Sequence, residues 1–214
     1  MNITMAEIRS IAESVRWLTR DQLDEAGGKY PPSLYYAFFR ALARIAKPKL
    51  SVVLGVCGGG DCYHIATGYP EGKVLGIDIA YDHPESVGYL ETKCKNFEFW
   101  LGNSLEEAKS AYDKYGPVDL LFVDTTHDYD QTTKEWNTWK PYLAPGAVVC
   151  FDDLFRPGVG EAWEKFPEPK ERMDWLHAGQ YPEGGGFGVI VMPPYPTTFA
   201  RVELPPIDAP EMGN

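Results

Sequence analysis

The sequence lacks the features that would place it on a nucleic acid or in a membrane. It has no run of basic residues, and 20 Lys and Arg against 31 Asp and Glu give a net charge of −11. Because phosphate affinity depends on clustered basic side chains, this balance argues against nucleic-acid partners and anionic membrane surfaces. No apolar stretch approaches the roughly 20 residues of a spanning helix, and residues 1–20 have no signal-peptide pattern. We therefore expect a cytoplasmic protein.

Cysteine is also scarce, with four residues in 214. Their spacing matches neither a zinc knuckle nor the dense disulfide framework of small secreted proteins. A chain of this length, 44% hydrophobic, can bury its own core without such supports. We expect one decorated domain whose thiols are reduced and mostly buried.

Residues 1–49 have the pattern of a helical extension. Thr4 and Glu7 form a capping box at the start of one helix, whereas the polar residues 21–30 are typical of a loop. Pro31, Pro32 and Ser33 begin a second helix, which Pro48 ends. This extension would cover the site or pair subunits into a homo-oligomer.

From residue 50 onward, short apolar runs alternate with segments long enough for helices. The expected strands are residues 50–56, 73–79, 97–101, 118–124 and 147–151, and the expected helices lie near 61–69, 84–95, 104–114 and 128–143. Apolar strands alternating with helices indicate a parallel sheet covered on both faces.

The carboxyl-terminal part has a different pattern. Residues 186–192 and 198–204 resemble strands joined by about five residues, too few for a crossover helix, so we expect an antiparallel pair. The predicted fold is α/β: a Rossmann-like, doubly wound, mostly parallel seven-stranded sheet over residues 50–204. Residues 205–214 form an irregular, proline-containing tail.

A glycine-rich turn follows the first strand. Residues 55–60 contain four glycines, which let backbone amides approach a ligand and favour a cofactor turn over a merely tight turn. Asp78 ends the second strand about twenty residues later, where an acid typically accepts hydrogen bonds from a ribose, although it could also cap a helix. Together these features indicate an adenosine-type cofactor. Ser104, after the third strand, is either a helix cap or a neighbour of the adenine.

Acidic residues follow the next two strands. Asp124 ends the fourth strand, and Asp152 and Asp153 follow the fifth. If these strands are neighbours, three carboxylates crowd one cleft, and a hard divalent cation such as Mg²⁺ would compensate their charge. The alternative is that each Asp caps the following segment. His127, one turn from Asp124, is a candidate base or a hydrogen-bonded structural group.

These motifs, in this order, resemble those of class I S-adenosylmethionine-dependent methyltransferases. The stretch from Asp124 to Tyr129, the segment Leu143-Ala144-Pro145-Gly146 and the pair Asp152-Asp153 are especially similar to small-molecule O-methyltransferases of the catechol and macrocin types. The resemblance implies a cofactor site at the turn and at the ends of the second to fourth strands. Its residues would be Gly55, Cys57, Gly59, Asp61, Asp78, Asn103, Ser104 and Asp124.

The resemblance also implies metal-assisted methylation of a small hydroxylated molecule. Asp124, Asp152 and Asp153 match the metal ligands of the catechol type, and His127 matches the place of its catalytic lysine. A nicotinamide-dependent oxidoreductase would share the glycine turn and Asp78 but leaves the three acids unexplained. A methyltransferase-like protein that binds the cofactor without methyl transfer stays open, because a fold does not fix a reaction. Residues 154–186 are the candidate lid.

Overall fold

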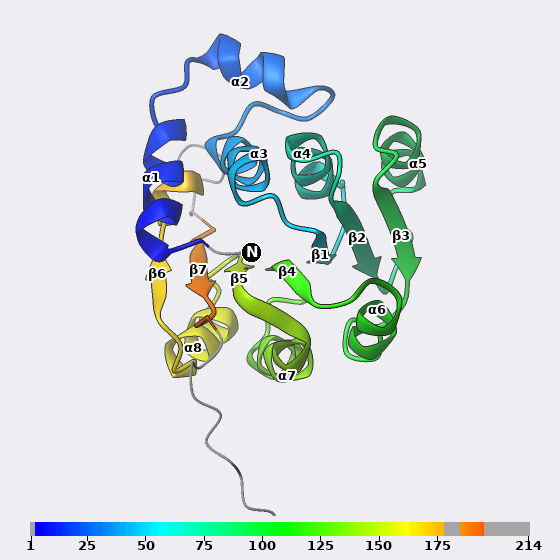
Figure 1. The fold of residues 1–214 in the computed structure, drawn as a ribbon, viewed down its shortest axis with the longest axis vertical. Helices are drawn as coiled ribbons and strands as arrows, with labels where there is room; N and C mark the ends of the chain where they lie inside the picture. Colours follow the sequence, from blue (N-terminus) through cyan, green and yellow to red (C-terminus); the bar gives the residue numbers. More distant parts are fainter. Residues whose placement is uncertain (1–2, 178–184, 195–214) are drawn as a thin grey trace, which may run out of the picture.

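A computed structural model of the chain describes residues 3–177 and 185–194. Within these residues, one seven-stranded sheet has the order β3-β2-β1-β4-β5-β7-β6, with helices on both faces (Figure 1). The strands are β1 (Leu50–Leu54), β2 (Lys73–Asp78), β3 (Phe97–Leu101), β4 (Val118–Val123), β5 (Leu143–Phe151), β6 (Lys170–Arg172) and β7 (Gly188–Val191). The doubly wound α/β fold expected from the sequence is confirmed.

The helices form one layer on each side of the sheet. In Figure 1, α3, α4 and α5 lie above it and α6, α7 and α8 lie below it, while α1 lies beside the β6–β7 edge and α2 lies over α3. The bounds are α1 (Met5–Val15), α2 (Arg20–Gly27), α3 (Leu34–Ala46), α4 (Gly60–Gly68), α5 (Pro84–Lys93), α6 (Ala108–Tyr115), α7 (Tyr129–Trp139) and α8 (Pro157–Lys165). Two short 3₁₀ helices are Lys140–Tyr142 and Asp174–His177.

The central strands are apolar because both of their faces are covered. Every residue of β1 and β4 is buried. Alternate side chains enter two cores: Phe122 packs with Phe38 and Phe39 of α3 on one side, and Leu121 packs with Trp136 and Trp139 of α7 on the other. Burial on both faces explains why these strands lack the alternation of half-exposed strands.

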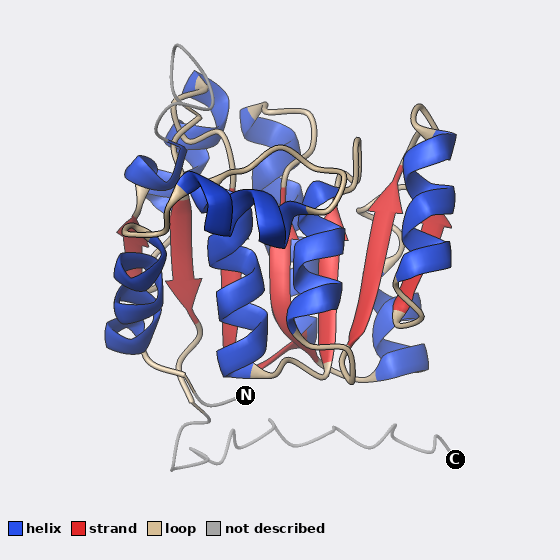
Figure 2. Cartoon of the chain, turned by 90° about the horizontal axis from the view of Figure 1, so that it is seen from above, coloured by secondary structure: helices blue, strands red, loops and turns tan. Residues whose placement is uncertain are grey.

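One strand runs against its neighbours, as expected. β7 is antiparallel to both β5 and β6, and its arrow is reversed in Figure 2. It confirms the strand predicted at residues 186–192. The partner predicted at 198–204 and the tail at 205–214 lie outside the described residues. Among the described residues, the edge strand is β6, which lies within the segment interpreted as a lid. Its three residues have charged side chains and therefore gave no apolar signal.

The prediction of a loop at residues 21–30 is wrong in its first part. Residues 20–27 form α2, which begins at Thr19 in a second capping box: the Gln22 amide donates to the Thr19 hydroxyl at 3.3 Å, and the Thr19 amide donates to Gln22 Oε1 at 2.9 Å. The helix is set by this local cap and carries few apolar residues, so apolar periodicity missed it. The capping box predicted at Thr4 is confirmed.

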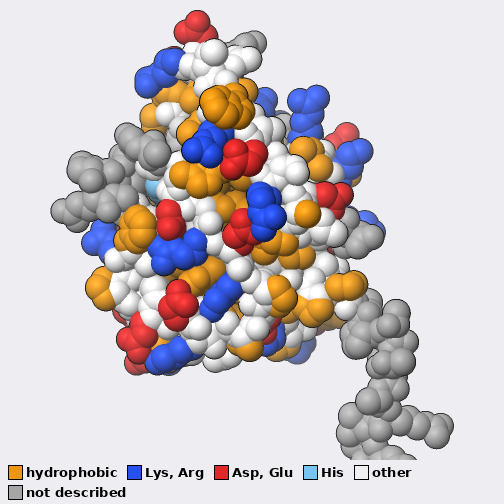
Figure 3. Space-filling view, turned by 90° about the vertical axis from the view of Figure 1, so that its left-hand side faces the viewer, with side chains coloured by type: hydrophobic (Ala, Val, Ile, Leu, Met, Phe, Trp, Pro, Cys, Tyr) orange, Lys and Arg blue, Asp and Glu red, His pale blue; other side chains and the backbone are white. Residues whose placement is uncertain are grey.

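The N-terminal helices carry a groove of about 420 Å³ lined by residues of α1, α2 and α3. Two large hydrophobic side chains are exposed in this region: Trp17, between α1 and α2, is 80% exposed, and Ile45 of α3 is 56% exposed. On the face that includes α1, hydrophobic side chains lie among charges of both signs (Figure 3). Pairing of subunits through these helices, and the boundary at residue 49, stay predictions. Among the described helices, none has the length and apolar character needed to cross a membrane.

Asn96 holds the connection that follows α4, the helix that starts at the glycine turn. Its side-chain amide donates to the carbonyl oxygens of Ala66 at 3.2 Å, Tyr69 at 3.3 Å and Gly72 at 2.7 Å. Asn96→Asp replaces this donor by a carboxylate facing three carbonyls, so we expect a loss of about 1–3 kcal/mol in the free energy of unfolding. Denaturant titration measures it, and unchanged stability of the variant would show that the amide is dispensable.

Candidate active site

The sheet register brings the candidate site residues to one edge of the sheet. Ile77, Leu54, Val123 and Phe151 are paired across β2, β1, β4 and β5. The next residue along each strand is therefore Asp78, Gly55, Asp124 or Asp152, and these four form one row at the carboxyl edge of the sheet. Ligands of open α/β sheets bind at this edge.

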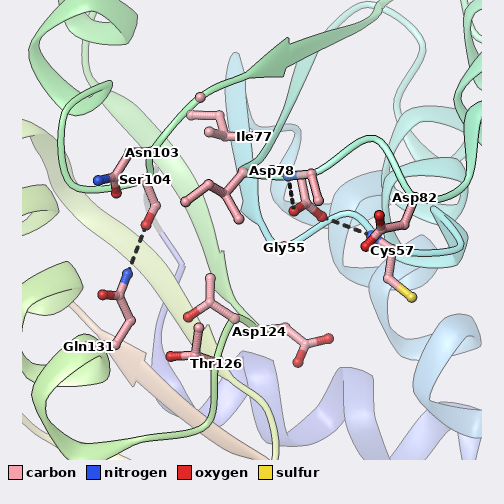
Figure 4. A pocket seen from close by; sticks show the side chains of 14 residues that line it. Gly55, Cys57, Ile77, Asp78, Asp82, Asn103, Ser104, Asp124, Thr126 and Gln131 are labelled. Carbon is pink, nitrogen blue, oxygen red and sulfur yellow. Dashed lines mark hydrogen bonds between the residues drawn. The ribbon is translucent and has the colours of Figure 1, made fainter.

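A cleft of about 350 Å³ opens over part of this row (Figure 4). Six residues predicted for the cofactor line it: Gly55, Cys57, Asp78, Asn103, Ser104 and Asp124. The cleft also contains residues that the sequence analysis did not single out, namely Ile77, Ile79, Ala80, Asp82, Gly102, Thr125, Thr126 and Gln131. Its volume is in the range of small-molecule sites.

Gly55 cannot be replaced by a residue with a side chain. Its φ of 85° lies in the left-handed region, and a Cβ would lie 1.8 Å from the carbonyl oxygen of Asp124. The Gly55 amide continues the sheet ladder by donating to Ile77 O at 2.9 Å. The backbone after β1 therefore passes directly against that after β4 and leaves the space in front of it open.

Asp78 ties the glycine turn to β2. Its Oδ2 accepts from the amides of Val56 at 2.8 Å and Cys57 at 3.2 Å, and its Oδ1 accepts from the Ala80 amide at 3.2 Å. A carboxylate has about four lone-pair positions, so capacity remains for hydroxyl donors of a ligand. Asp78 thus both shapes the turn and faces the cleft.

Glu135 of α7 organises the far end of the cleft. It is fully buried and accepts from Ser104 Oγ at 2.6 Å, Thr125 Oγ1 at 2.8 Å and Gln131 Nε2 at 2.9 Å. Burial raises the pKa of Glu135, while these hydrogen bonds act to lower it. The Ser104 hydroxyl also accepts from Gln131 (Figure 4), so Ser104 is fixed by side chains rather than serving as a simple helix cap.

Asp124, His127 and Asp153 converge at the other end. His127 Nε2 lies 3.0 Å from Asp124 Oδ1 and 3.0 Å from Asp153 Oδ2, and within the described residues this is the one group of acidic, His or Cys side chains close enough to hold a metal ion. Both His127 (φ 58°) and Asp153 (φ 54°) have left-handed backbones, which cost energy in non-glycine residues and concentrate at functional sites.

Burial and like charge shape the titration of this group. Burial raises the pKa of Asp124 to about 6, opposed by its hydrogen bond with His127 and reinforced by Asp152. The pKa of Asp153 is raised by burial and then by Asp152. The hydrogen bond with Asp124 raises the pKa of His127, so a proton on this imidazole is favoured. Protonated His127 is the counter-charge of the cluster, and only its neutral form is a candidate proton acceptor.

Asp152 lies beside this cluster but is directed elsewhere. Its Oδ1 is 3.0 Å from His177 Nε2 and accepts from the Asp153 amide at 2.7 Å, and its Oδ2 accepts from the Tyr35 hydroxyl at 3.2 Å. The structure therefore brings together two of the three predicted metal ligands, with His127 between them. The third is held by residues from α3 and from the 3₁₀ helix Asp174–His177.

Gly59 and Asp61, predicted for the cofactor, are not among the residues that line this cleft. Gly59 has a φ of 76° and packs against Leu90. A Cβ added to Gly59 would lie 2.5 Å from Leu90 Cδ1. Asp61, in the first turn of α4, is 9% exposed, and its Oδ1 has no hydrogen-bond partner among the described residues. Burial, followed by the charges of Asp124 and Asp152, raises its pKa well above the usual value.

The sequence analysis missed four side chains that support the site. Gln131 and Glu135 are four residues apart, so they share one face of α7, and this spacing could have identified them. Tyr35 and His177 reach Asp152 from segments remote in sequence, for which no local signal exists.

Comparison with known proteins agrees with this geometry. Residues 52–154 match a family model described as a methyltransferase domain. Over these residues the chain is similar to methyltransferase domains. The matched residues run from β1 through the glycine turn to Asp152 and Asp153, so they contain the row of residues at the carboxyl edge. A comparison with curated protein sequences gives no significant match.

Solved methyltransferases share the fold of the chain. An O-methyltransferase from Bacillus cereus, solved in complex with SAH, has a TM-score of 0.62 at 16% identity, covering 87% of this chain and 89% of its own. The O-methyltransferase TomG from Streptomyces achromogenes, involved in tomaymycin synthesis and solved with SAM, has a TM-score of 0.59 at 19% identity, covering 79% and 89%.

The raised pKa of Asp124 predicts a specific pH dependence of stability. Its value in the folded protein, about 6, lies above that of an unfolded Asp, about 3.9. Ionised Asp124 therefore costs stability above pH 6, and this cost disappears as the pH falls toward 4. In chelator, we expect Asp124→Asn to be more stable than wild type at pH 8, by about 1–2 kcal/mol, and the advantage to shrink at pH 5.

Thermal unfolding at both pH values measures this effect, with the exposed Asp130→Asn as the control for loss of one negative charge. A variant that is less stable than wild type at pH 8 would mean that His127 more than compensates the buried charge.

Proposed function

We propose that this protein is an S-adenosylmethionine-dependent O-methyltransferase acting on a small hydroxylated molecule. One observation carries the proposal: the cleft that starts at the glycine turn and Asp78 ends at Asp124, and Asp124 also belongs to the cluster with His127 and Asp153. A cofactor site and a proton-accepting group thus meet at one residue. The SAH and SAM in the two solved methyltransferases of the same fold support this choice of cofactor.

The residues of the cleft suit the parts of the cofactor. Asp78 would accept the ribose hydroxyls, Asn103 and Ser104 would flank the adenine with Ile79, and the backbone of Gly55 and Cys57 would approach the methionine part. The partly exposed carboxylates of Asp124 and Asp153 would provide a negative environment for the sulfonium charge. Gly59 and Asp61 would shape the turn and the start of α4 without lining the cleft.

The protein's task in methyl transfer is alignment and deprotonation. The sulfonium methyl is already activated, so the acceptor oxygen must be held in line with it and must lose its proton. His127 Nε2 lies 3.0 Å from Asp124 and from Asp153 and donates to these carboxylates. The other ring nitrogen, Nδ1, would take the proton, and the two carboxylates would stabilise the imidazolium that forms. Asp124 thus lines the cofactor cleft and also contacts His127, the proposed base.

The carboxylates of this cluster meet the requirements of a divalent cation in part. Asp124 and Asp153 offer carboxylate oxygens whose pKa values are raised by burial and by like charge, the situation that a cation relieves. These two residues would hold Mg²⁺, whereas Asp152, the third predicted ligand, contacts Tyr35 and His177 and would have to turn toward the cation. A bound cation would lower the pKa of the acceptor hydroxyl.

One observation favours a second candidate function. Asp152 is directed toward Tyr35 and His177 rather than toward Asp124, which suits a protein of this fold that binds the cofactor without transferring its methyl group. A screen of hydroxyl compounds with radiolabelled S-adenosylmethionine separates the two, because only the methyltransferase gives a labelled organic product.

We expect isothermal titration calorimetry to detect one S-adenosylhomocysteine site per chain. Asp78→Ala removes the ribose acceptor and the partner of two turn amides, so binding should weaken by about 10-fold or more. Asp130→Asn, an exposed acid of α7 that does not line the cleft, is the matched control. Tight NADH binding without S-adenosylhomocysteine binding would favour the oxidoreductase.

Once an acceptor is found, His127→Ala should slow methyl transfer by about 10²–10⁴-fold with nearly unchanged S-adenosylhomocysteine affinity.

If a cation binds, Mg²⁺ should raise the melting temperature of wild type through preferential binding to the folded state, and Asp153→Asn should reduce this shift. Full activity in chelator would remove the metal from the mechanism and leave His127 as the base. A fully active His127→Ala would exclude that role.

A further inference from the structure

Glu135 sets the direction of three hydrogen bonds at one end of the cleft. Its carboxylate is fully buried and does not line the cleft, whereas the three side chains that donate to it, Ser104, Thr125 and Gln131, all do. Ser104 Oγ and Gln131 Nε2 lie 2.6 and 2.9 Å from Glu135 Oε1, and Thr125 Oγ1 lies 2.8 Å from Oε2. A buried carboxylate must be satisfied by donors, so the protons of these groups point toward Glu135.

Because these protons are used, the three side chains have only acceptors left for a ligand. A hydroxyl has one proton, so Ser104 and Thr125, which donate to Glu135, retain lone pairs alone. Gln131 uses both N–H groups of its amide, one toward Glu135 and one toward Ser104 Oγ at 3.2 Å, so its Oε1 is the atom that stays available (Figure 4). This group of side chains is therefore arranged to receive hydrogen-bond donors.

Two neighbouring contacts keep this arrangement in place. The indole of Trp139, itself fully buried, donates to the backbone oxygen of Ser104 at 2.9 Å and so holds this residue independently of its hydroxyl. The Asn103 amide nitrogen donates to Glu106 Oε1 at 3.3 Å and points away from Ser104 (Figure 4). Neither contact adds a donor to the three side chains that Glu135 holds.

We propose that Glu135 is a positioning residue that selects the base of the cofactor: by holding Ser104, Thr125 and Gln131 as acceptors, it favours a purine with an exocyclic amino group over one with a carbonyl in the same place. The inference rests on the proposed function, which places the adenine beside Ser104. A carbonyl oxygen there would face acceptors with no proton between them, and sites built around hydrogen bonds discriminate strongly against ligands that cannot make them.

Isothermal titration calorimetry with two ligands tests the proposal without need of a methyl acceptor or a metal. S-adenosylhomocysteine carries the amino group, and S-inosylhomocysteine carries a carbonyl in its place. Wild type should bind the inosyl compound at least about 10-fold more weakly. In Glu135→Gln the introduced amide can donate to Ser104, whose hydroxyl proton can then turn toward the ligand, so the two affinities should come within about threefold of each other. Asp130→Asn, an exposed acid of the same helix, is the control and should keep the wild-type ratio.

The ratio of the two affinities separates positioning from a structural role. A structural defect would weaken the binding of both ligands, whereas loss of orientation relaxes the choice between them. Equal affinities in wild type, or a wild-type ratio retained by folded Glu135→Gln, would overturn the inference. Absence of S-adenosylhomocysteine binding to wild type would instead contradict the proposed function itself.

Ser104→Ala decides the question if Glu135→Gln does not fold. This substitution removes one acceptor and frees the Gln131 N–H that pointed at it, so we expect the ratio of the two affinities to fall by about threefold or more. Circular dichroism checks that the variant is folded. A folded Ser104→Ala that discriminates between the two ligands as well as wild type does would contradict the role of these hydrogen bonds.

Discussion

The close parallel pairing of β1 with β4 is the constraint on which the site depends. It places the backbone of Gly55 so close to the carbonyl of Asp124 that a side chain at residue 55 would not fit. The same register places Asp78 on one side and Asp152 on the other. The glycine turn, the carboxylate proposed to accept the ribose and the acidic cluster are thereby adjacent, although they are separated by up to about a hundred residues in sequence.

The electrostatics of the site follow from this crowding. Asp61, Asp124, Asp152 and Asp153 lie within a small, largely buried region, and burial raises the pKa of three of them, namely Asp61, Asp124 and Asp153. Several groups of the described chain face these acids: His127 beside Asp124 and Asp153, Arg156 at 3.7 Å from Asp153 Oδ2, and the Tyr35 hydroxyl and His177 beside Asp152. A cationic ligand at this place would relieve repulsion that the protein alone only partly offsets, which is why a sulfonium cofactor suits the site.

The sequence predicted most of this arrangement for a physical reason. Strands buried on both faces give continuous apolar runs, and parallel strands put the residues after them on one edge, so Gly55, Asp78, Asp124 and Asp152 could be placed from spacing alone. Local caps predicted α1 at Thr4, and the same rule applied to Thr19 would have predicted α2. The charged strand β6 left no pattern, because only its pairing with β7 makes it a strand.

The direction in which the site side chains point could not be predicted from the sequence. Asp152 and Asp153 are adjacent, yet one faces Tyr35 and His177 and the other faces His127, because the left-handed backbone at Asp153 turns the chain between them. Tyr35 and His177 enter through packing of α3 and of a 3₁₀ helix that no spacing rule connects to β5.

The most direct test of the account is a crystal structure with S-adenosylhomocysteine. The account predicts the ribose on Asp78, the adenine beside Ser104 and the sulfur directed toward Asp124 and His127. A ligand bound away from the glycine turn, or a sulfur directed away from that cluster, would contradict it.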